Sequence, residues 1–267
     1  MRLFISADIE GTTGISHWDE TDYDRGGRWY DYFRELMTAE VSEACKGAHD
    51  AGAEYIHVKD AHDLARNIIP TALPNYVSIN RNWSGHPFCM VAGLDEGFDA
   101  LAYTGYHSPA HSTSNPLAHT LNTHLEEITI NGKRASEYMI HSYIAAMLGI
   151  PVIFLAGDKG LCETARELSP GIVTVATNIG IGAGVTSPHP TVTQEMLYDG
   201  MKSAVLKGGD NCFVKLPSSF DVSIKYTVHH RAYKNSFYPG ASLIGDKTVA
   251  YASNDYMEIL RFFHFTT

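Results

Sequence analysis

The sequence predicts an α/β fold, a three-layer sandwich around a mostly parallel central sheet. Short apolar runs alternate with stretches whose apolar residues recur every three or four positions through the first 160 residues. Strands that are separated by helices pair in parallel, because a helical crossover returns the chain to the same edge of the sheet. A chain of 267 residues can bury the core that a sheet covered on both faces requires.

The first part of the chain alternates the two kinds of element. The helical spacing is clear in Phe33, Met37 and Val41, and Gly52 supplies a C-cap beyond them. An Asn-Gly turn ends the strand predicted at 126–132. In order, the predicted elements are a strand at 2–8, a helix at 30–52, strands at 54–62, 76–80, 100–107 and 126–132, a helix at 135–149 and a strand at 151–158.

The last hundred residues are more mixed. Their predicted elements are a strand at 171–180, a helix at 191–208, a strand at 220–227 and a terminal helix at 256–265. The chain contains no Pro- or Ser-rich linker and no internal repeat. The sequence therefore predicts a single domain over 1–267, and a small C-terminal lobe at about 185–250 is the alternative.

Composition and charge exclude several classes of function. The formal net charge is −10, and no basic stripe is available to neutralise phosphates, which argues against a nucleic-acid partner. The apolar runs are shorter than the roughly 20 residues that span a bilayer, and an acidic residue follows the N-terminal apolar run too early for a signal peptide. The four cysteines form no C-x-x-C pair. These features predict a cytoplasmic protein with no membrane partner.

Polar side chains gather where the predicted strands end. In open α/β sheets, ligands bind at the carboxyl ends of the strands. The residues there are Asp8 and Glu10, Asp60 and His62, His107, and Asp158. A single acid at such a position is usually a helix cap or a turn former. Several metal-ligand types at neighbouring strand ends make a metal site an equally good interpretation.

The stretch "SADIEG" contains two acids one residue apart. Side chains alternate along an extended chain, so Asp8 and Glu10 can face the same side. Two carboxylates held this close stay ionised only if a positive charge lies between them. Together with the imidazole of His62, such oxygen ligands suit zinc, and also manganese or cobalt. Asp60 is either a partner that orients His62 or a cap.

Common catalytic motifs are absent from the sequence. It contains no H-E-x-x-H helix, no G-x-S-x-G elbow and no G-x-x-x-x-G-K-[ST] loop. These absences argue against the usual mononuclear zinc protease, serine hydrolase and phosphate-binding loop. A binding module whose acids and histidines hold a structural metal, or none, remains an alternative to an enzyme.

Several motifs together resemble one protein family. "ISADIEGTTGI", "VKDAHD", "YTGYHSPA", "AHT", "INGKRASEYM" and "FLAGD" occur in the order and approximate spacing of the bacterial zinc-dependent D-aminopeptidases. The resemblance covers nearly the whole chain, including "FDVSIKY" and "YPGASLIGDKTVAYASND". It implies two zinc ions in each subunit, with Asp8 bridging them. The implied metal ligands are Asp8, Glu10, His62, His107 and Glu137.

The resemblance also implies a catalytic histidine, as a base or a nucleophile, at His119. On chemical grounds acid/base catalysis is favoured over nucleophilic attack by the imidazole, since the ordinary imidazole pKa near 6.5 suits proton transfer. The segment from His107 to His119 is one residue longer than in the family pattern and contains an additional His111. His111 is therefore the alternative to His119.

The resemblance implies an aminopeptidase that removes N-terminal D-amino acids from short peptides, such as those derived from peptidoglycan. It further implies a closed homo-oligomer, a decamer, with the sites facing an internal chamber. A dinuclear amidase or phosphoesterase acting on another small substrate is the alternative enzyme, as is an aminopeptidase selective for L-residues. The negative charge suits attraction of the ammonium group of a peptide.

Overall fold

A seven-stranded sheet forms the centre of the molecule. The computed structural model describes residues 1–267, apart from the side chains of residues 25, 26 and 28. The strand order is β3-β2-β1-β4-β7-β8-β9, and neighbours pair in parallel except β8 with β9. The strands are β1 (Arg2–Ala7), β2 (Tyr55–Asp60), β3 (Val77–Asn80), β4 (Ala100–Tyr106), β7 (Val152–Asp158), β8 (Val173–Ile181) and β9 (Gly184–Thr186). The prediction of a mostly parallel central sheet is confirmed.

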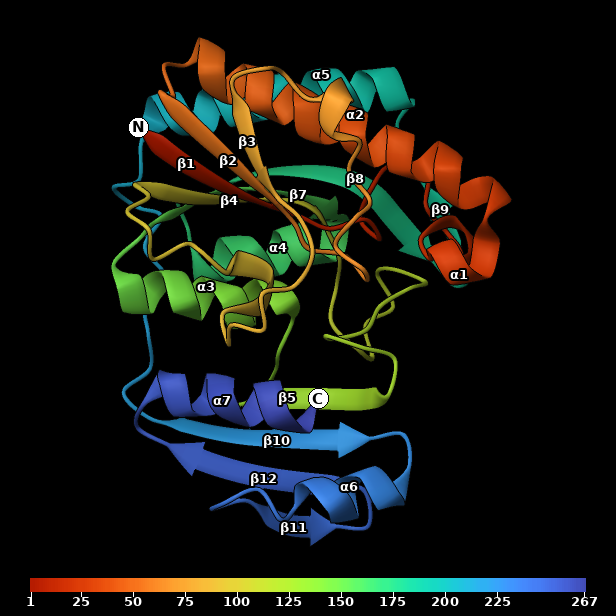
Figure 1. Cartoon of the computed structure of the whole chain (residues 1–267), viewed down its shortest axis with the longest axis vertical. Helices are drawn as coiled ribbons and strands as arrows, with labels where there is room; N and C mark the ends of the chain where they lie inside the picture. The colour runs from red at the N-terminus through yellow and green to blue at the C-terminus, as the bar shows by residue number, and fades with distance from the viewer.

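Helices cover both faces of this sheet (Figure 1). One face is covered by α2 (Arg28–Asp50) and α5 (Pro190–Lys207), and the other by α3 (Glu137–Leu148) and α4 (Lys159–Leu168). Apolar side chains pack against each face in a separate core cluster. The predicted three-layer arrangement is therefore confirmed. The short elements before and between these are η1 (Trp18–Glu20), α1 (Tyr23–Gly26), η2 (Pro70–Ala72) and η3 (Cys89–Val91).

A second, antiparallel sheet lies beyond α3 (Figure 1). Its order is β11-β12-β10-β5-β6, and the segment predicted as a strand at 126–132 pairs here with β10. The helix α7 lies between α3 and this sheet. These elements are β5 (Leu125–Ile130), β6 (Lys133–Arg134), β10 (Phe220–Tyr226), α6 (His229–Asn235), β11 (Ser242–Gly245), β12 (Thr248–Ser253) and α7 (Tyr256–Thr266). Whether the chain is one domain or carries a separate lobe stays a prediction.

The parallel register places three strand ends side by side. Ala7 at the end of β1 pairs with Asp60 on one side and Thr104 on the other. The residues that follow these strands therefore leave the same edge of the sheet. No helix among the described residues combines the length and apolar character that crossing a bilayer requires.

Two glycines allow the chain after β1 to pass close to the end of β4. The amide of Gly11 donates a hydrogen bond of 2.8 Å to the carbonyl oxygen of Gly105. A Cβ at Gly11 would lie 2.0 Å from the carbonyl oxygen of Tyr106. Gly105 has a φ of +68°, and its Cβ would lie 2.0 Å from the carbonyl oxygen of Asp8. The chain that carries Asp8 and Glu10 is thus held against β4 by backbone contacts.

We expect the substitution Gly11→Ala to destabilise the protein by about 3 kcal/mol or more, because the methyl group collides with rigid backbone. Urea unfolding would measure the change in the free energy of unfolding. Gly184→Ala is the matched control, since the nearest atom to its Cβ would be 3.7 Å away. We expect a change within about 0.5 kcal/mol for this control. Equal stability of the two variants would contradict the importance of the close approach.

Candidate metal centre

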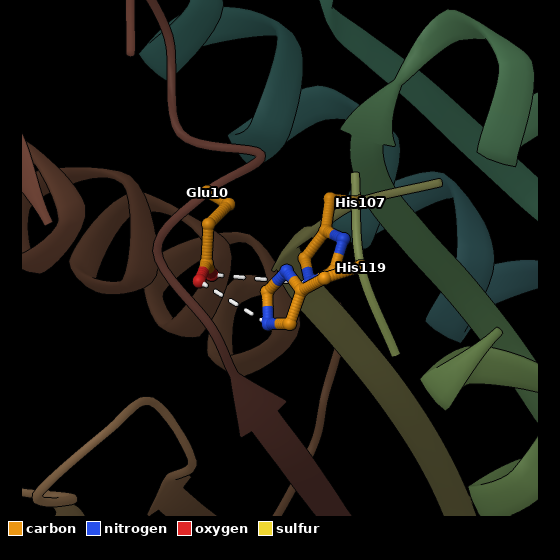
Figure 2. Close-up of side chains that lie close together, drawn as sticks. All are labelled: Glu10, His107 and His119. Atoms are coloured by element: carbon orange, nitrogen blue, oxygen red, sulfur yellow. Dashed lines mark ion pairs between the residues drawn. The ribbon is translucent and has the colours of Figure 1, made fainter. Parts of the chain in front are cut away.

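Six predicted side chains converge beyond the carboxyl ends of β1, β2 and β4. The three carboxylates are nearly inaccessible, with exposed fractions of 1–3% for the whole residues. Glu10 faces the stacked rings of His107 and His119 (Figure 2). The converging residues are Asp8, Glu10, His62, His107, His119 and Glu137. The structure thus brings together all the metal ligands and the catalytic histidine that the family resemblance implies.

Each of the three histidines has one ring nitrogen beside a backbone carbonyl. A hydrogen bond from that nitrogen fixes the ring and leaves the other nitrogen facing the carboxylates. The three pairs are His62 Nε2 with Thr21 (3.1 Å), His107 Nδ1 with Ser108 (2.9 Å) and His119 Nδ1 with Leu117 (2.9 Å). This arrangement matches the way that metal-binding histidines are held.

The candidate ligand atoms form three groups, of which two share Asp8 and the third joins Glu10, His107 and His119. His62 Nδ1 lies 3.2 Å from Asp8 Oδ1 and 3.2 Å from Glu10 Oε1. His107 Nε2 lies 3.6 Å from Asp8 Oδ2 and 3.5 Å from Glu137 Oε2. Zinc bonds of about 2.0–2.1 Å in a tetrahedral arrangement place neighbouring ligand atoms roughly 3.3 Å apart. The spacing and the chemistry of these donors therefore fit zinc.

Two buried polar atoms in this cluster lack hydrogen-bond partners among the described residues. They are Glu10 Oε2 and His107 Nε2, which lie 4.0 Å apart. Buried polar atoms are nearly always paired, because leaving one unpaired costs about 1–3 kcal/mol. An ion bound between the carboxylates and the imidazoles would satisfy both atoms.

The carboxylates influence one another strongly. Burial raises the pKa of Asp8 well above its usual range, and the neighbouring Glu10 raises it further. Burial also opposes ionisation of Glu10, but the charge of His62 outweighs it and holds the pKa of Glu10 well below its usual range. Burial is likewise outweighed at Glu137, where His107 lowers the pKa to about 2. The acids therefore need compensating positive charge, which a divalent cation supplies.

The pKa values of the three histidines in the cluster shift in two directions. Burial would lower the pKa of His62 and of His107, but the carboxylates, Glu10 for His62 and Glu137 for His107, raise both well above the ordinary value. The pKa of His119, by contrast, is lowered by burial and by the charge of His107. His119 is thus the imidazole of the cluster that favours the neutral state, in which one nitrogen can accept a proton.

His119 stands at the edge of the cluster. Its ring stacks on that of His107, with 4.3 Å between centroids, and meets the edge of Trp18 at 5.2 Å. Its Nε2 lies 3.8 Å from Glu10 Oε1. His111, the alternative from the sequence, has a side chain that is 43% exposed and lies by Glu126. Geometry therefore favours His119.

Two strand-end acids that the sequence singled out support the loops that carry the cluster. Asp158 accepts hydrogen bonds from the amide (2.5 Å) and hydroxyl (2.6 Å) of Ser108, which follows His107. Asp60 accepts hydrogen bonds from the amide (2.6 Å) and side chain (2.8 Å) of Asn67, whose side chain also donates to the carbonyl of His62. Asp60 thus orders the loop of His62 rather than contacting its ring.

The cluster opens into a cavity of about 500 Å³. Sequence patterns did not predict its other walls, because they come from segments far apart in the chain. Trp18 and Trp83 line one part of the cavity, and Leu260 and Phe263 of α7 line another. A small molecule that enters the cavity can therefore reach His119 and the carboxylates.

Comparisons with known proteins agree with this geometry. The family model described as D-aminopeptidase matches residues 1–265. A D-aminopeptidase of Bacillus subtilis (strain 168) is 28% identical over 261 residues, which cover 97% of this chain and 93% of the relative. A solved structure of the zinc-dependent D-aminopeptidase DppA from Bacillus subtilis, described as a self-compartmentalizing protease, superposes with a TM-score of 0.91 at 25% identity. The match covers 98% of this chain and 95% of that one. The chain belongs to the D-aminopeptidase family.

Proposed function

We propose that this protein is a zinc-dependent aminopeptidase that removes N-terminal D-amino acids from short peptides, such as those derived from peptidoglycan. The observation that carries the proposal is the convergence of three buried carboxylates and three imidazoles at one end of a cavity. Family membership supports the reaction class, and the zinc-dependent relative supports the metal.

Two zinc ions per chain would be held by Asp8, Glu10, His62, His107 and Glu137, with Asp8 shared between them. Manganese or cobalt suits the same donors. Zinc bound there would supply Lewis-acid chemistry, which polarises a scissile carbonyl and lowers the pKa of a water molecule. Glu10 Oε1 lies 3.2 Å from His62 Nδ1 and 3.8 Å from His119 Nε2, so the proposed base lies beside the proposed metal ligands.

His119 acts as the acid/base of the proposed reaction. Its Nδ1 donates to the carbonyl of Leu117, which leaves the lone pair of Nε2 directed at the cluster. Nε2 takes a proton from the attacking water and returns it to the leaving amine. Stacking on His107 and contact with Trp18 hold the ring while its charge changes. Acid/base chemistry needs no covalent bond to the imidazole.

The proposal is tested with protein that has been stripped by a chelator and then reloaded with zinc. We expect the reloaded protein to hydrolyse D-alanyl p-nitroanilide faster than the L-enantiomer, and the stripped protein to be inactive. Faster cleavage of the L-substrate would leave a metallopeptidase and remove the D-selectivity. Activity on an unrelated amide or phosphoester, with none on either anilide, would support the alternative enzymes and overturn the aminopeptidase.

We further propose that the chain assembles into a closed homo-oligomer, a decamer by family resemblance. The relative described as self-compartmentalizing supports assembly. Exposed apolar side chains also support it, among them Phe237 just after α6 (70% exposed) and Ile244 on β11 (62% exposed). Light scattering after gel filtration is expected to give a mass near ten times 29.4 kDa. A monomer at micromolar concentration would contradict this proposal.

The chain is proposed to act as one domain in the cytoplasm. Leu260 and Phe263 of α7, which packs on the second sheet, line the same cavity as Asp8 after β1, so both sheets contribute to one site. All four cysteines are free thiols, the state that a reducing compartment maintains.

A further inference from the structure

The cavity has a closed end and an open end. The lining residues Met90, Ile140 and Leu260 are at most 4% exposed, so they form its closed end. Trp83 is 38% exposed, and His86 is also exposed, so these residues form its mouth. A peptide has nothing before its N-terminal residue. That residue can therefore occupy the closed end while the rest of the peptide leaves through the mouth.

The closed end adjoins the metal centre on one face of α3. Glu137, Ile140 and His141 are three and four residues apart, which places them on the same face of the helix. Ile140 belongs to a core cluster with Leu260 and Phe263 of α7. The side chain of a residue whose scissile carbonyl lies at the cluster would therefore contact an apolar wall.

His141 is the polar group in this wall. It is 1% exposed, and its Nδ1 donates a hydrogen bond of 2.7 Å to the carbonyl oxygen of Glu137. In a neutral imidazole with a proton on Nδ1, Nε2 carries a lone pair. Among the described residues, no hydrogen bond is formed by Nε2. His141 thus brings one hydrogen-bond acceptor to the buried wall formed by Ile140, Leu260 and Phe263, whereas the polar lining residues His264 and Thr267 are exposed.

No lysine or arginine lines the cavity among the residues whose side chains are described. An acidic substrate side chain would find no positive partner at the closed end, where Ile140, Leu260 and Phe263 offer only apolar contacts. Burial of an unpaired charge is costly, so this end favours an uncharged side chain.

We propose that Met90, Ile140, His141, Leu260 and Phe263 form the pocket for the side chain of the N-terminal substrate residue, and that His141 selects a hydroxyl-bearing side chain there. This inference rests on the proposed aminopeptidase function. The hydroxyl of a serine-like residue donates a hydrogen bond to His141 Nε2, while the apolar wall contacts its methylene group. The substrate class is a short peptide with a small, uncharged N-terminal residue, and serine is favoured over an apolar residue of the same size.

Serine and 2-aminobutyrate form a matched pair, because they differ only in a hydroxyl and a methyl group. We expect zinc-loaded protein to hydrolyse D-seryl p-nitroanilide with a kcat/KM about tenfold above that of the D-2-aminobutyryl compound, as expected for one hydrogen bond. In His141→Phe the ratio is expected to fall to about one. His49→Phe, which changes an exposed histidine on α2 away from the cavity, is expected to keep the ratio. Equal rates for the two substrates in the unaltered protein would overturn the assignment of His141.

A second variant tests the pocket without changing His141. Leu260→Ala enlarges the closed end, so we expect kcat/KM for D-leucyl relative to D-alanyl p-nitroanilide to rise about tenfold or more. An unchanged ratio in a folded Leu260→Ala protein would overturn the assignment of the apolar wall.

Binding measurements distinguish a wrong assignment of the pocket from a wrong assignment of the enzymatic activity. If the zinc-loaded protein hydrolyses none of the anilides, the proposed function fails. Calorimetry with D-serine hydroxamate and D-2-aminobutyrate hydroxamate then tests the pocket alone. About tenfold tighter binding of the serine compound, lost in His141→Phe, supports the inference. Equal affinities, or no binding of either compound, overturn it.

Discussion

Replacing His119 with asparagine is expected to lower kcat by about 10²–10⁴-fold and to leave the zinc content unchanged. The reason is the position of His119 at the edge of the cluster. Its Nε2 lies 3.8 Å from Glu10 Oε1 and 3.7 Å from Glu137 Oε1, close enough to serve a water that is attacking at the cluster. Asparagine cannot transfer this proton, and no other imidazole of the cluster has its pKa lowered below the ordinary value.

The control for this prediction is His111→Asn. His111 comes from the same loop, but its side chain is 43% exposed and lies 3.9 Å from Glu126 rather than at the cluster. We expect this variant to retain its kcat. Steady-state kinetics and metal analysis of both proteins would measure the effect. Loss of activity in His111→Asn with full activity in His119→Asn would show that the alternative histidine is the catalytic one.

The pH profile gives a second measurement on the same variants. A general base works in its neutral form, which predominates above its pKa. Because burial and the charge of His107 lower the pKa of His119, we expect kcat/KM to be lost only below the ordinary histidine value of about 6.5. This acid limb should be absent from the residual activity of His119→Asn.

Replacing Asp8 with asparagine is expected to abolish activity and to remove at least half of the bound zinc. Asp8 belongs to two groups of candidate ligands, one with Glu10 and His62 and the other with His107 and Glu137. Asparagine offers one neutral amide oxygen, which binds a cation more weakly than an ionised carboxylate and cannot supply two oxygens to the two groups. The loss of metal affinity should therefore exceed the roughly 10–100-fold loss caused by replacing a residue that hydrogen-bonds to a metal ligand.

Asp210→Asn is the matched control, since this aspartate is exposed and lies outside the cluster. Zinc content after dialysis, measured by emission spectroscopy, and kcat of both variants would test the prediction. A fully active Asp8→Asn protein with unchanged zinc would contradict the assignment of Asp8 as a ligand.

Much of the central sheet could be predicted from the sequence, because its signals are local. Alternation and apolar runs indicated β1, β2 and β4, and the three- to four-residue spacing of Phe33, Met37 and Val41 indicated α2. The second sheet was harder, since β6 and β11 are short and β11 is exposed throughout. Short exposed strands carry little periodic pattern, so their pairing depends on the fold around them.

The site residues likewise differ in whether a local sequence signal predicts them. Asp8, Glu10, His62 and His107 follow strands, and the rule for strand ends in α/β sheets is enough to single them out. Glu137 carries no such signal. It is the first residue of α3 after the N-cap Ser136, a position that favours acids for electrostatic reasons alone.

The walls of the cavity could not be predicted from local patterns. The sequence predicted the terminal helix that carries Leu260 and Phe263, and α7 packs between α3 and the second sheet. Their contact with the cavity depends on how α7 is placed against α3, about 120 residues earlier in the chain. The spacing of apolar residues along the sequence does not predict such a tertiary arrangement.

We expect two zinc ions bound at this cluster to support hydrolysis of a D-aminoacyl substrate. Chelator-stripped protein would be titrated with zinc while bound zinc and hydrolysis of D-alanyl p-nitroanilide are measured in the same samples. Activity is expected to reach its plateau when two zinc ions are bound per chain. Full activity in the stripped protein, or two bound zinc ions without hydrolysis, would contradict it.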